Sequence, residues 1–218
     1  MILSDPFQQM RNYLRDPKRI YQQSFETITK EVDLTHYSPA IRTLVKRVIH
    51  ACGMTDIIHD LVVSDGLTEV VREAMTHHKI FCDSRMVQAG ILARYLPPSL
   101  TIACSLDHPD VRQYAKRHQL TLSAAAMACY SQNWQNAILI IGNAPTALFE
   151  LLYQLKIQST KPAAIIAFPV GFVGAAESKD LLVKTPHGIP FITLLGRRGG
   201  SAMAAAALNG ILVGDQTD

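Results

Sequence analysis

The stretch NAILIIGNAPTALFELLYQLK, residues 136–156, places an apolar run, a tight turn and a helical segment in immediate succession. The same order occurs twice more, over residues 163–183 and 190–212. Each run is apolar throughout, which is typical of a strand buried on both faces of a parallel sheet. Because these strands alternate with helices, the sequence predicts a Rossmann-like α/β fold, with a mostly parallel sheet and helices on both faces.

Shorter segments upstream extend this pattern. KIFCD at 79–83 and LTIAC at 100–104 predict further buried strands, each followed by a helical stretch. Asp83 closes the first of these strands and is expected to cap the helix after it. Helices are also expected at about residues 56–64 and 66–76.

Two additional helices are predicted at the N-terminal end. An Asp-Pro pair at 16–17 and a Ser-Pro pair at 38–39 each combine an N-cap with a proline at the first helical position. The second helix runs to His50, and Gly53 is expected to stop it.

Composition limits the class of protein. The chain has 218 residues, 48% of them hydrophobic and 18% charged, which is enough to bury a sizeable core. We expect a single domain over 17–218, preceded by a flexible arm over 1–16. A net charge of +3 without a long Lys/Arg run argues against nucleic acid as a partner. No apolar run reaches about 18 residues, so no membrane span is expected.

The cysteines and histidines lack the spacing of metal sites. Four cysteines, at 52, 82, 104 and 129, stand far apart within apolar runs, and no CxxC or HExxH motif occurs. Neither a metal site nor a disulfide framework is therefore predicted. Buried, reduced thiols indicate a cytoplasmic protein.

The turns that follow the last three strands form a first candidate site. Ligands bind outside the carboxyl ends of parallel strands, and each turn leads into a helix N-terminus that favours anions. The side-chain donors in these turns are Asn143, Thr146, Arg197 and Arg198. Arginine pairs well with carboxylates. The two arginines are adjacent and point in different directions, so only one is expected to contact a ligand.

Other interpretations of these turns remain open. No GxxxxGK[ST] occurs and no GxGxxG follows a strand, so a nucleotide is unsupported. Tight turns of this composition also serve chain reversal alone. Glu177 and Lys179, near the start of the next helix, are either functional or part of a solvated first turn.

The stretch RTLVKRVIHACGM, residues 42–54, forms a second candidate site. Its apolar residues make one buried stripe, and His50 points almost opposite that stripe, with Arg47 one turn before it. This polar side is either a solvated helix face or the wall of a site. Ser24 lies on the apolar side of the preceding helix, where a serine bonded back to a carbonyl is the default interpretation.

Taken together, several blocks resemble the precorrin-8X methylmutase family. They are RVIHACG (47–53), GNAPTALFELL (142–152), PVGFVGAAESKD (169–180) and GRRGGSAMAAAALN (196–209), supported by IYQQSF (20–25) and CDSRM (82–86). The resemblance covers about residues 17–212 and keeps the order of the blocks. It is therefore more specific than any single motif.

The resemblance implies a homodimeric isomerase of cobalamin biosynthesis with an acidic corrinoid substrate and no external cofactor. It moves a methyl group from C11 to C12, converting precorrin-8X to hydrogenobyrinate or the cobalt form to cobyrinate. His50 matches the family's catalytic histidine, and Ser24 and Arg47 match substrate contacts. On this interpretation the polar helix side is a site wall, and the helix C-terminus is expected to favour the charged form of His50.

Three further features point to a homodimer. The small-residue helix near the C-terminus suits close helix contact, a macrocycle exceeds one shallow sheet edge, and Trp134 is a residue type favoured at interface cores. The helix and the tryptophan also fit a role inside one chain.

Two stretches depart from the family pattern. Thr121-Leu122-Ser123 stands where Thr-Arg-Ser is common, and His108-Pro109-Asp110 where Asp-Pro-Arg is usual. They leave the details of carboxylate recognition open. The competing hypotheses are a non-catalytic tetrapyrrole carrier on the same fold and a nucleotide-using enzyme.

Overall fold

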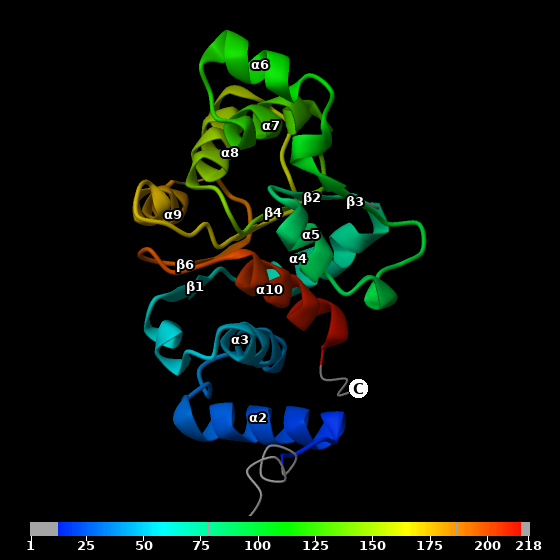
Figure 1. Cartoon of the computed structure of the whole chain (residues 1–218), viewed down its shortest axis with the longest axis vertical. Coiled ribbons are helices and arrows are strands. Elements are labelled where there is room, and N and C mark those ends of the chain that lie inside the picture. Colours follow the sequence, from blue (N-terminus) through cyan, green and yellow to red (C-terminus); the bar gives the residue numbers. More distant parts are fainter. Residues whose placement is uncertain (1–12, 78, 186, 215–218) are drawn as a thin grey trace, which may run out of the picture.

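A six-stranded sheet forms the centre of the computed structural model, which describes residues 13–77, 79–185 and 187–214 (Figure 1). Its order is β1-β6-β5-β4-β2-β3, and every neighbouring pair is parallel except β1 with β6. The strands are β1 (Leu61–Val63), β2 (Lys79–Cys82), β3 (Thr101–Cys104), β4 (Ile138–Ile141), β5 (Ala164–Ala167) and β6 (Phe191–Leu194). The predicted α/β fold is confirmed. Most of the expected N-terminal arm, residues 1–12, lies outside the described residues.

Helices connect these strands and extend the N-terminal end. They are α2 (Pro17–Glu31), α3 (Pro39–Cys52), α4 (Leu67–Ala74), α5 (Arg85–Gly90), α6 (Val111–His118), α7 (Leu122–Tyr130), α8 (Pro145–Ile157), α9 (Ala175–Lys184) and α10 (Ser201–Val213). Short 3₁₀ helices lie at η1 (Thr55–His59), η2 (Met75–His77), η3 (Ala93–Tyr95), η4 (Ser105–Asp107) and η5 (Ser131–Asn133). None of the described helices is long and apolar enough to cross a membrane.

Alternate residues of the parallel strands supply two separate cores. On one face, Ile140 and Ile166 pack with buried residues of α3, α4, α5 and α10. On the other, Leu139 and Ile165 pack with α7, α8 and α9. This is the period-two alternation of a sheet covered on both faces, and Figure 1 shows the two helical layers.

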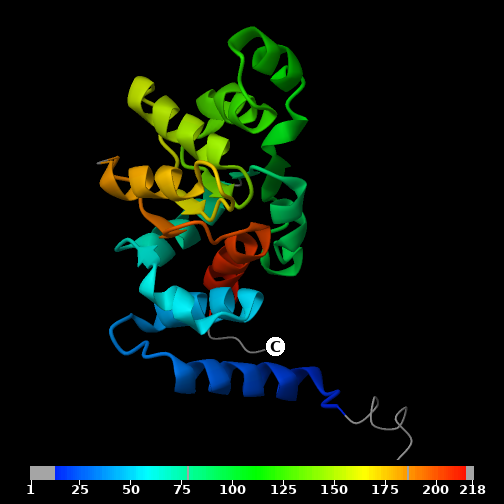
Figure 2. The same ribbon diagram turned by 60° about the vertical axis from the view of Figure 1, so that its left-hand side comes forward.

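The predicted N-terminal helix boundaries are confirmed. The Asp16 side chain accepts hydrogen bonds from the backbone N–H groups of Lys18 and Arg19. Gly53 ends α3 in the left-handed conformation, with φ of 68°, and the last helical residue, Cys52, lies two residues beyond the expected His50. Figure 2 shows α2 as an outermost layer beyond α3.

The prediction of a helix over 56–64 is wrong. That segment forms η1 and then β1, which pairs antiparallel with β6 at the sheet edge, so that Leu61 faces Leu194. A short apolar run does not distinguish a strand from a helix by periodicity, and pairing with β6 decided the outcome here. The helix expected over 66–76 is confirmed as α4 followed by η2.

The alanine-rich helix α10 is buried within the core of the single chain. Ten of its residues are buried, from Met203 to Val213. A Cβ added at Gly210 would lie 2.7 Å from the Cα of Leu44 in α3, so the two backbones touch. Trp134 is also buried, with 1% exposure. Both residue features that suggested a dimer interface therefore belong to the monomer's own core.

Gly210→Ala tests this close approach. Alanine normally stabilises a helix interior relative to glycine by about 0.5–1 kcal/mol. Here the added methyl meets backbone atoms, so we expect a loss of about 1–3 kcal/mol in the free energy of unfolding. Urea denaturation measures the change. A stabilised variant would show that α3 and α10 are not in backbone contact.

Candidate functional site

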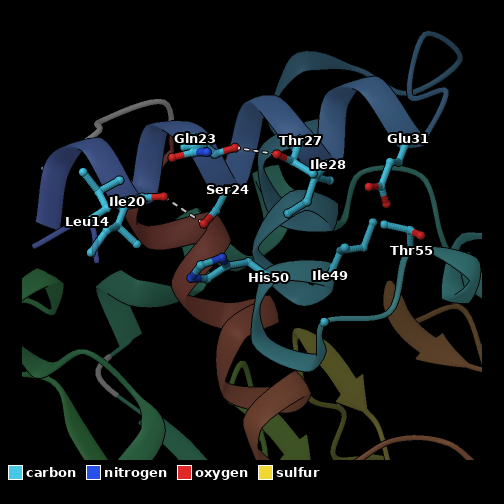
Figure 3. Close-up of a pocket in the computed structure, with 11 residues that line it drawn as sticks. Leu14, Ile20, Gln23, Ser24, Thr27, Ile28, Glu31, Ile49, His50 and Thr55 are labelled. Carbon is cyan, nitrogen blue, oxygen red and sulfur yellow. Dashed lines mark hydrogen bonds between the residues drawn. The ribbon is translucent and has the colours of Figure 1, made fainter. Parts of the chain in front are cut away.

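A groove of about 540 Å³ lies between α2 and the C-terminal end of α3 (Figure 3). Polar side chains of α2, among them Gln23, Ser24 and Thr27, form one wall. His50 of α3 and Thr55 of η1 lie on the other. Ile20 and Ile49 add apolar surface. The groove therefore combines apolar surface with hydrogen-bonding groups, as small-molecule sites do.

Ser24 and His50 lie on facing elements and point toward each other in this groove (Figure 3). The Ser24 hydroxyl donates to the carbonyl of Ile20 at 2.8 Å, which is the back-bonded geometry expected by default. Because its proton is used in that bond, the oxygen is left to accept a hydrogen bond from the groove side.

His50 is solvent-exposed at the groove and packs beside two rings of α2. Its ring centroid lies 5.1 Å from that of Tyr21 and 5.6 Å from that of Phe25. Loss of water around the ring, and secondarily the charge of Arg47, lower the pKa of His50 below its usual 6.5. The expectation that the helix end favours the charged form is therefore wrong, because these two effects act against it.

Arg47 does not lie on an open polar side of α3. It is only 8% exposed, and its Nη1 donates to the Tyr21 hydroxyl at 2.6 Å. The guanidinium lies 5.4 Å from the centroid of the Tyr21 ring and 5.8 Å from that of Phe25. Among the described residues its buried Nε has no hydrogen-bond partner. The placement of Arg47 beside His50 on the polar side of α3 is therefore wrong, because α2 buries Arg47, which is not among the residues that line the groove, whereas His50 lines it.

Tyr21 is a residue of this site to which no sequence motif assigned a role. The available signal was the i, i+4 spacing of Tyr21 and Phe25, which places both rings on one side of α2.

The predicted meeting of the strand-end turns is confirmed. Because β4, β5 and β6 are adjacent and parallel, their carboxyl ends share one edge. The N–H of Gly171 donates to the carbonyl of Arg197 at 3.2 Å, and that of Gly200 to the carbonyl of Phe168 at 2.7 Å. These two turns are packed directly on each other.

The turn after β4 is already filled by a carboxylate of the chain. Asp83 is buried and accepts hydrogen bonds from the backbone N–H groups of residues 142, 143 and 144, at 3.0, 2.9 and 2.8 Å. Burial raises the pKa of Asp83, and these three donors oppose that shift. The expected cap of the following helix is wrong, because Ser84 caps α5 and Asp83 reaches across the sheet instead.

The side chains of that turn are placed differently from each other. Asn143 is exposed, so its amide is accessible. Thr146 shares a hydrogen bond of 2.8 Å with the hydroxyl of Thr121. Thr146 is therefore the less available of the two donors.

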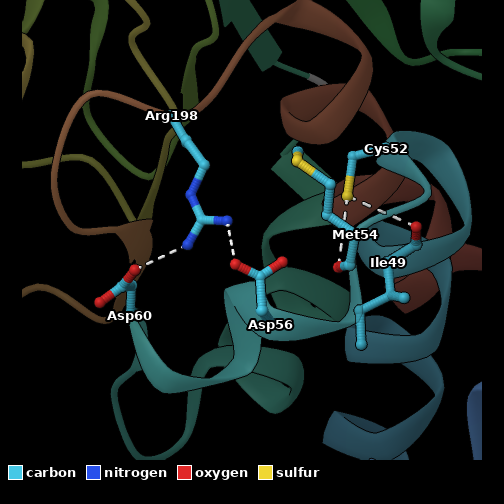
Figure 4. A network of polar contacts seen from close by, with 6 residues as sticks. All are labelled: Ile49, Cys52, Met54, Asp56, Asp60 and Arg198. Atoms are coloured by element: carbon cyan, nitrogen blue, oxygen red, sulfur yellow. Dashed lines mark hydrogen bonds and ion pairs between the residues drawn. The ribbon is translucent and has the colours of Figure 1, made fainter. Parts of the chain in front are cut away.

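The two arginines of the last turn do point in different directions. Arg198 donates to Asp56 at 2.6 Å and to Asp60 at 2.8 Å (Figure 4). Arg197 is exposed, with its guanidinium 5.7 Å from the centroid of the Phe172 ring. Phe172 itself is 86% exposed. Arg197 is thus the more available of the two, and Arg198 is engaged with carboxylates of the chain.

Lys179 is fully buried, so the solvated first turn is the wrong interpretation for this residue. Its ammonium donates to the carbonyl of Arg198 at 2.6 Å. Burial lowers the pKa of Lys179 to about 8. Glu177, by contrast, is exposed as that interpretation expected. No cluster of three potential metal ligands occurs within the described residues.

Comparisons with known proteins agree with one another. Residues 19–213 match the sequence profile of the family described as precorrin-8X methylmutase. The chain is 45% identical to a precorrin-8X methylmutase of Pseudomonas aeruginosa, over 93% of this chain and 98% of that one. It is 42% identical to one of a Sinorhizobium species, over 92% and 96%. A solved structure titled "precorrin-8X methylmutase related protein" superposes with a TM-score of 0.78 at 32% identity, covering 85% of this chain and 97% of that one.

The titration of His50 tests the electrostatics of the groove. In the ligand-free protein we expect the His50 ring to titrate below pH 6.5, and Arg47→Met to raise that pKa because a repelling charge is removed. NMR shifts of the ring protons against pH, assigned with His50→Gln, measure both values. Lys46→Met is the control for loss of a neighbouring cation. A His50 pKa above 6.5 in the wild type would favour the helix dipole as the dominant influence.

Proposed function

The chain belongs to the precorrin-8X methylmutase family, and we propose that the groove between α2 and α3 is where it isomerises its substrate. The protein is an isomerase that moves a methyl group from C11 to C12 of precorrin-8X or of cobalt-precorrin-8. The observation that carries the proposal is the facing pair of Ser24 and His50, on two helices that enclose one groove. A methyl shift is an internal rearrangement, so the proposal requires no external cofactor.

His50 is the proposed proton-handling residue. A methyl migration around a conjugated ring requires the ring to be held still and its electronic state to be adjusted by a proton. In the ligand-free protein, partial loss of water around the ring and the charge of Arg47 lower the pKa of His50, which favours its neutral form. Carboxylates of a bound corrinoid offset the charge of Arg47 and raise the pKa of His50 in the complex. His50 then donates or shares a proton with a ring nitrogen.

Ser24 and Arg47 are the proposed substrate contacts nearest His50. The Ser24 oxygen accepts a hydrogen bond from the ligand, since its own proton is held by Ile20. The buried Nε of Arg47 is a charged donor that a carboxylate would satisfy. Arg47 is buried and does not line the groove in the ligand-free chain, so this contact requires the surroundings of Arg47 to open.

Arg197 is the proposed contact for the acidic periphery of the ring at the strand-end turns. It places a cation beside an exposed aromatic ring, which complements a flat macrocycle with carboxylates at its edge. Asn143 adds an accessible amide on the neighbouring turn, and Thr146, whose hydroxyl is also bonded to Thr121, is a secondary contact. Arg198 is not proposed as a direct contact.

A homodimer is proposed as the working form, in the cytoplasm. Its support is the surface left open by one chain, because only Ile28 of α2 is buried and the groove is bounded on one side by this thinly packed helix. A second chain would complete the wall that a macrocycle needs. The four free cysteines are consistent with a reducing compartment.

His50→Ala separates an enzyme from a non-catalytic carrier. Because His50 is exposed, the variant should fold with near-normal stability, whereas turnover of precorrin-8X should fall by about 10²–10⁴-fold. Absorbance at the corrin bands follows the reaction, and circular dichroism checks the fold. His118→Ala, on the distant helix α6, is the matched control. Near-normal turnover by folded His50→Ala protein would refute the proton-handling role.

Arg197→Ala tests the peripheral contact. Affinity for the product hydrogenobyrinate should fall as ionic strength rises, because exposed charges are screened. The variant should bind about two- to fivefold more weakly at low salt and show a smaller salt dependence. Fluorescence titration measures the dissociation constants. Lys184→Ala, which removes an exposed cation at the far end of α9, should leave them unchanged. An Arg197→Ala protein with wild-type affinity at every salt concentration would exclude this contact.

Sedimentation equilibrium at micromolar concentration tests the dimer. We expect twice the chain mass of 24.1 kDa, and loss of product binding on dilution below the dimer dissociation constant. A monomer that turns over substrate at the full rate would reject a pocket completed by a second chain.

A further inference from the structure

Arg198 connects two parts of the chain that are far apart in sequence. It lies in the turn between β6 and α10. Of its two carboxylate partners, Asp56 lies within η1 and Asp60 directly follows it, and η1 comes two residues after the helix that carries His50 (Figure 4). One guanidinium nitrogen binds Asp56 and the other binds Asp60. The Arg198 hydrogen bond is the main reason that the pKa of Asp56 lies below its usual value.

The segment held in this way forms part of the groove. Gly53 and Thr55, which line the groove with His50, lie between the end of α3 and the first of these carboxylates. A backbone hydrogen bond from Leu195 to the carbonyl of Asp60, at 2.9 Å, holds the other end of η1 to the sheet. The position of Gly53 and Thr55 relative to the sheet therefore depends on the contacts of Asp56 and Asp60.

The backbone of Arg198 is itself held by a buried side chain. The ammonium of Lys179, fully buried in α9, donates to its carbonyl. Exposed ion pairs contribute little to folding stability. Two such pairs on one guanidinium, anchored by a buried ammonium, instead restrict geometry. We propose that Arg198 is a positioning residue, which holds η1 and the His50 end of α3 in register with the strand-end turns.

Cys52 offers a readout of this position that does not depend on activity. It lies two residues after His50, and its sulfur is within hydrogen-bonding distance of the carbonyls of Ile49, at 3.4 Å, and Met54, at 3.8 Å (Figure 4). Burial raises the pKa of the Cys52 thiol, which slows its reaction with disulfide reagents. Loosening of η1 would expose this thiol and accelerate that reaction.

The experiment compares Arg198→Ala, Arg198→Lys, Asp56→Asn and Asp60→Asn with wild type. We expect kcat to fall about tenfold or more in Arg198→Ala and Asp60→Asn, with KM changed less than about twofold, because misplacement of reacting groups lowers the chemical step. Lysine keeps the charge but lacks the planar fork of donors on the guanidinium, so Arg198→Lys should be intermediate. Modification of Cys52 by DTNB, located by peptide mass mapping, should accelerate in the same order. Lys184→Ala, which removes an exposed ion pair with Asp180, is the control.

A raised KM with unchanged kcat and unchanged Cys52 reactivity would show that Arg198 contacts substrate directly and would overturn the inference. Unchanged values in all four variants would overturn it as well. If Arg198→Ala does not fold, the two aspartate variants carry the same test from the other side of the ion pairs. The inference rests on the proposed role of His50, and its failure is distinguishable: an active His50→Ala rejects the site, whereas an inactive His50→Ala beside unaffected Arg198 variants rejects only the positioning role.

Discussion

The backbone contact between α3 and α10 is the constraint on which the rest of the structure depends. Gly210 leaves no side chain at the crossing, so α3 lies against α10 at Leu44, with the side chain of Arg47 close to the same point. The helix α3, which carries His50, therefore packs directly on α10, which begins at the last strand-end turn. One crossing fixes both halves of the proposed site relative to the sheet, and α2 then covers part of α3.

Charge is distributed unevenly over the possible anion sites. Asp83 occupies the N–H groups of the turn after β4, and the carboxylates of Asp56 and Asp60 occupy Arg198. These N–H groups and the Arg198 guanidinium are therefore already paired with carboxylates of the chain. Arg47 has not, because its Nε is buried without a partner among the described residues and its charge lowers the pKa of the neighbouring His50. A carboxylate that reached this donor would be stabilised, and Arg47 lies one turn before His50, although Arg47 is not itself among the residues that line the groove.

The sequence was sufficient to predict the sheet and most helix boundaries, because they follow from local chemistry. Apolar runs, Asp-Pro and Ser-Pro starts and the stop at Gly53 act over a few residues. The prediction of a helix over 56–64 was wrong because the pairing of this segment with β6 is a long-range effect. The environments of Arg47, Asp83 and Lys179 were predicted wrongly for the same reason. Each depends on a partner from a distant element, namely Tyr21, the turn after β4 and the carbonyl of Arg198. Residue types located the candidate site, and only packing separated Arg197 from Arg198.

A structure of the protein with hydrogenobyrinate bound tests the central claim most directly. The account predicts that the corrin ring occupies the groove between α2 and α3, with an imidazole nitrogen of His50 within hydrogen-bonding distance of the ring and Ser24 on the facing wall. A ring bound with His50 left in contact with solvent alone, for example against α8 at the far face of the sheet, would contradict the account.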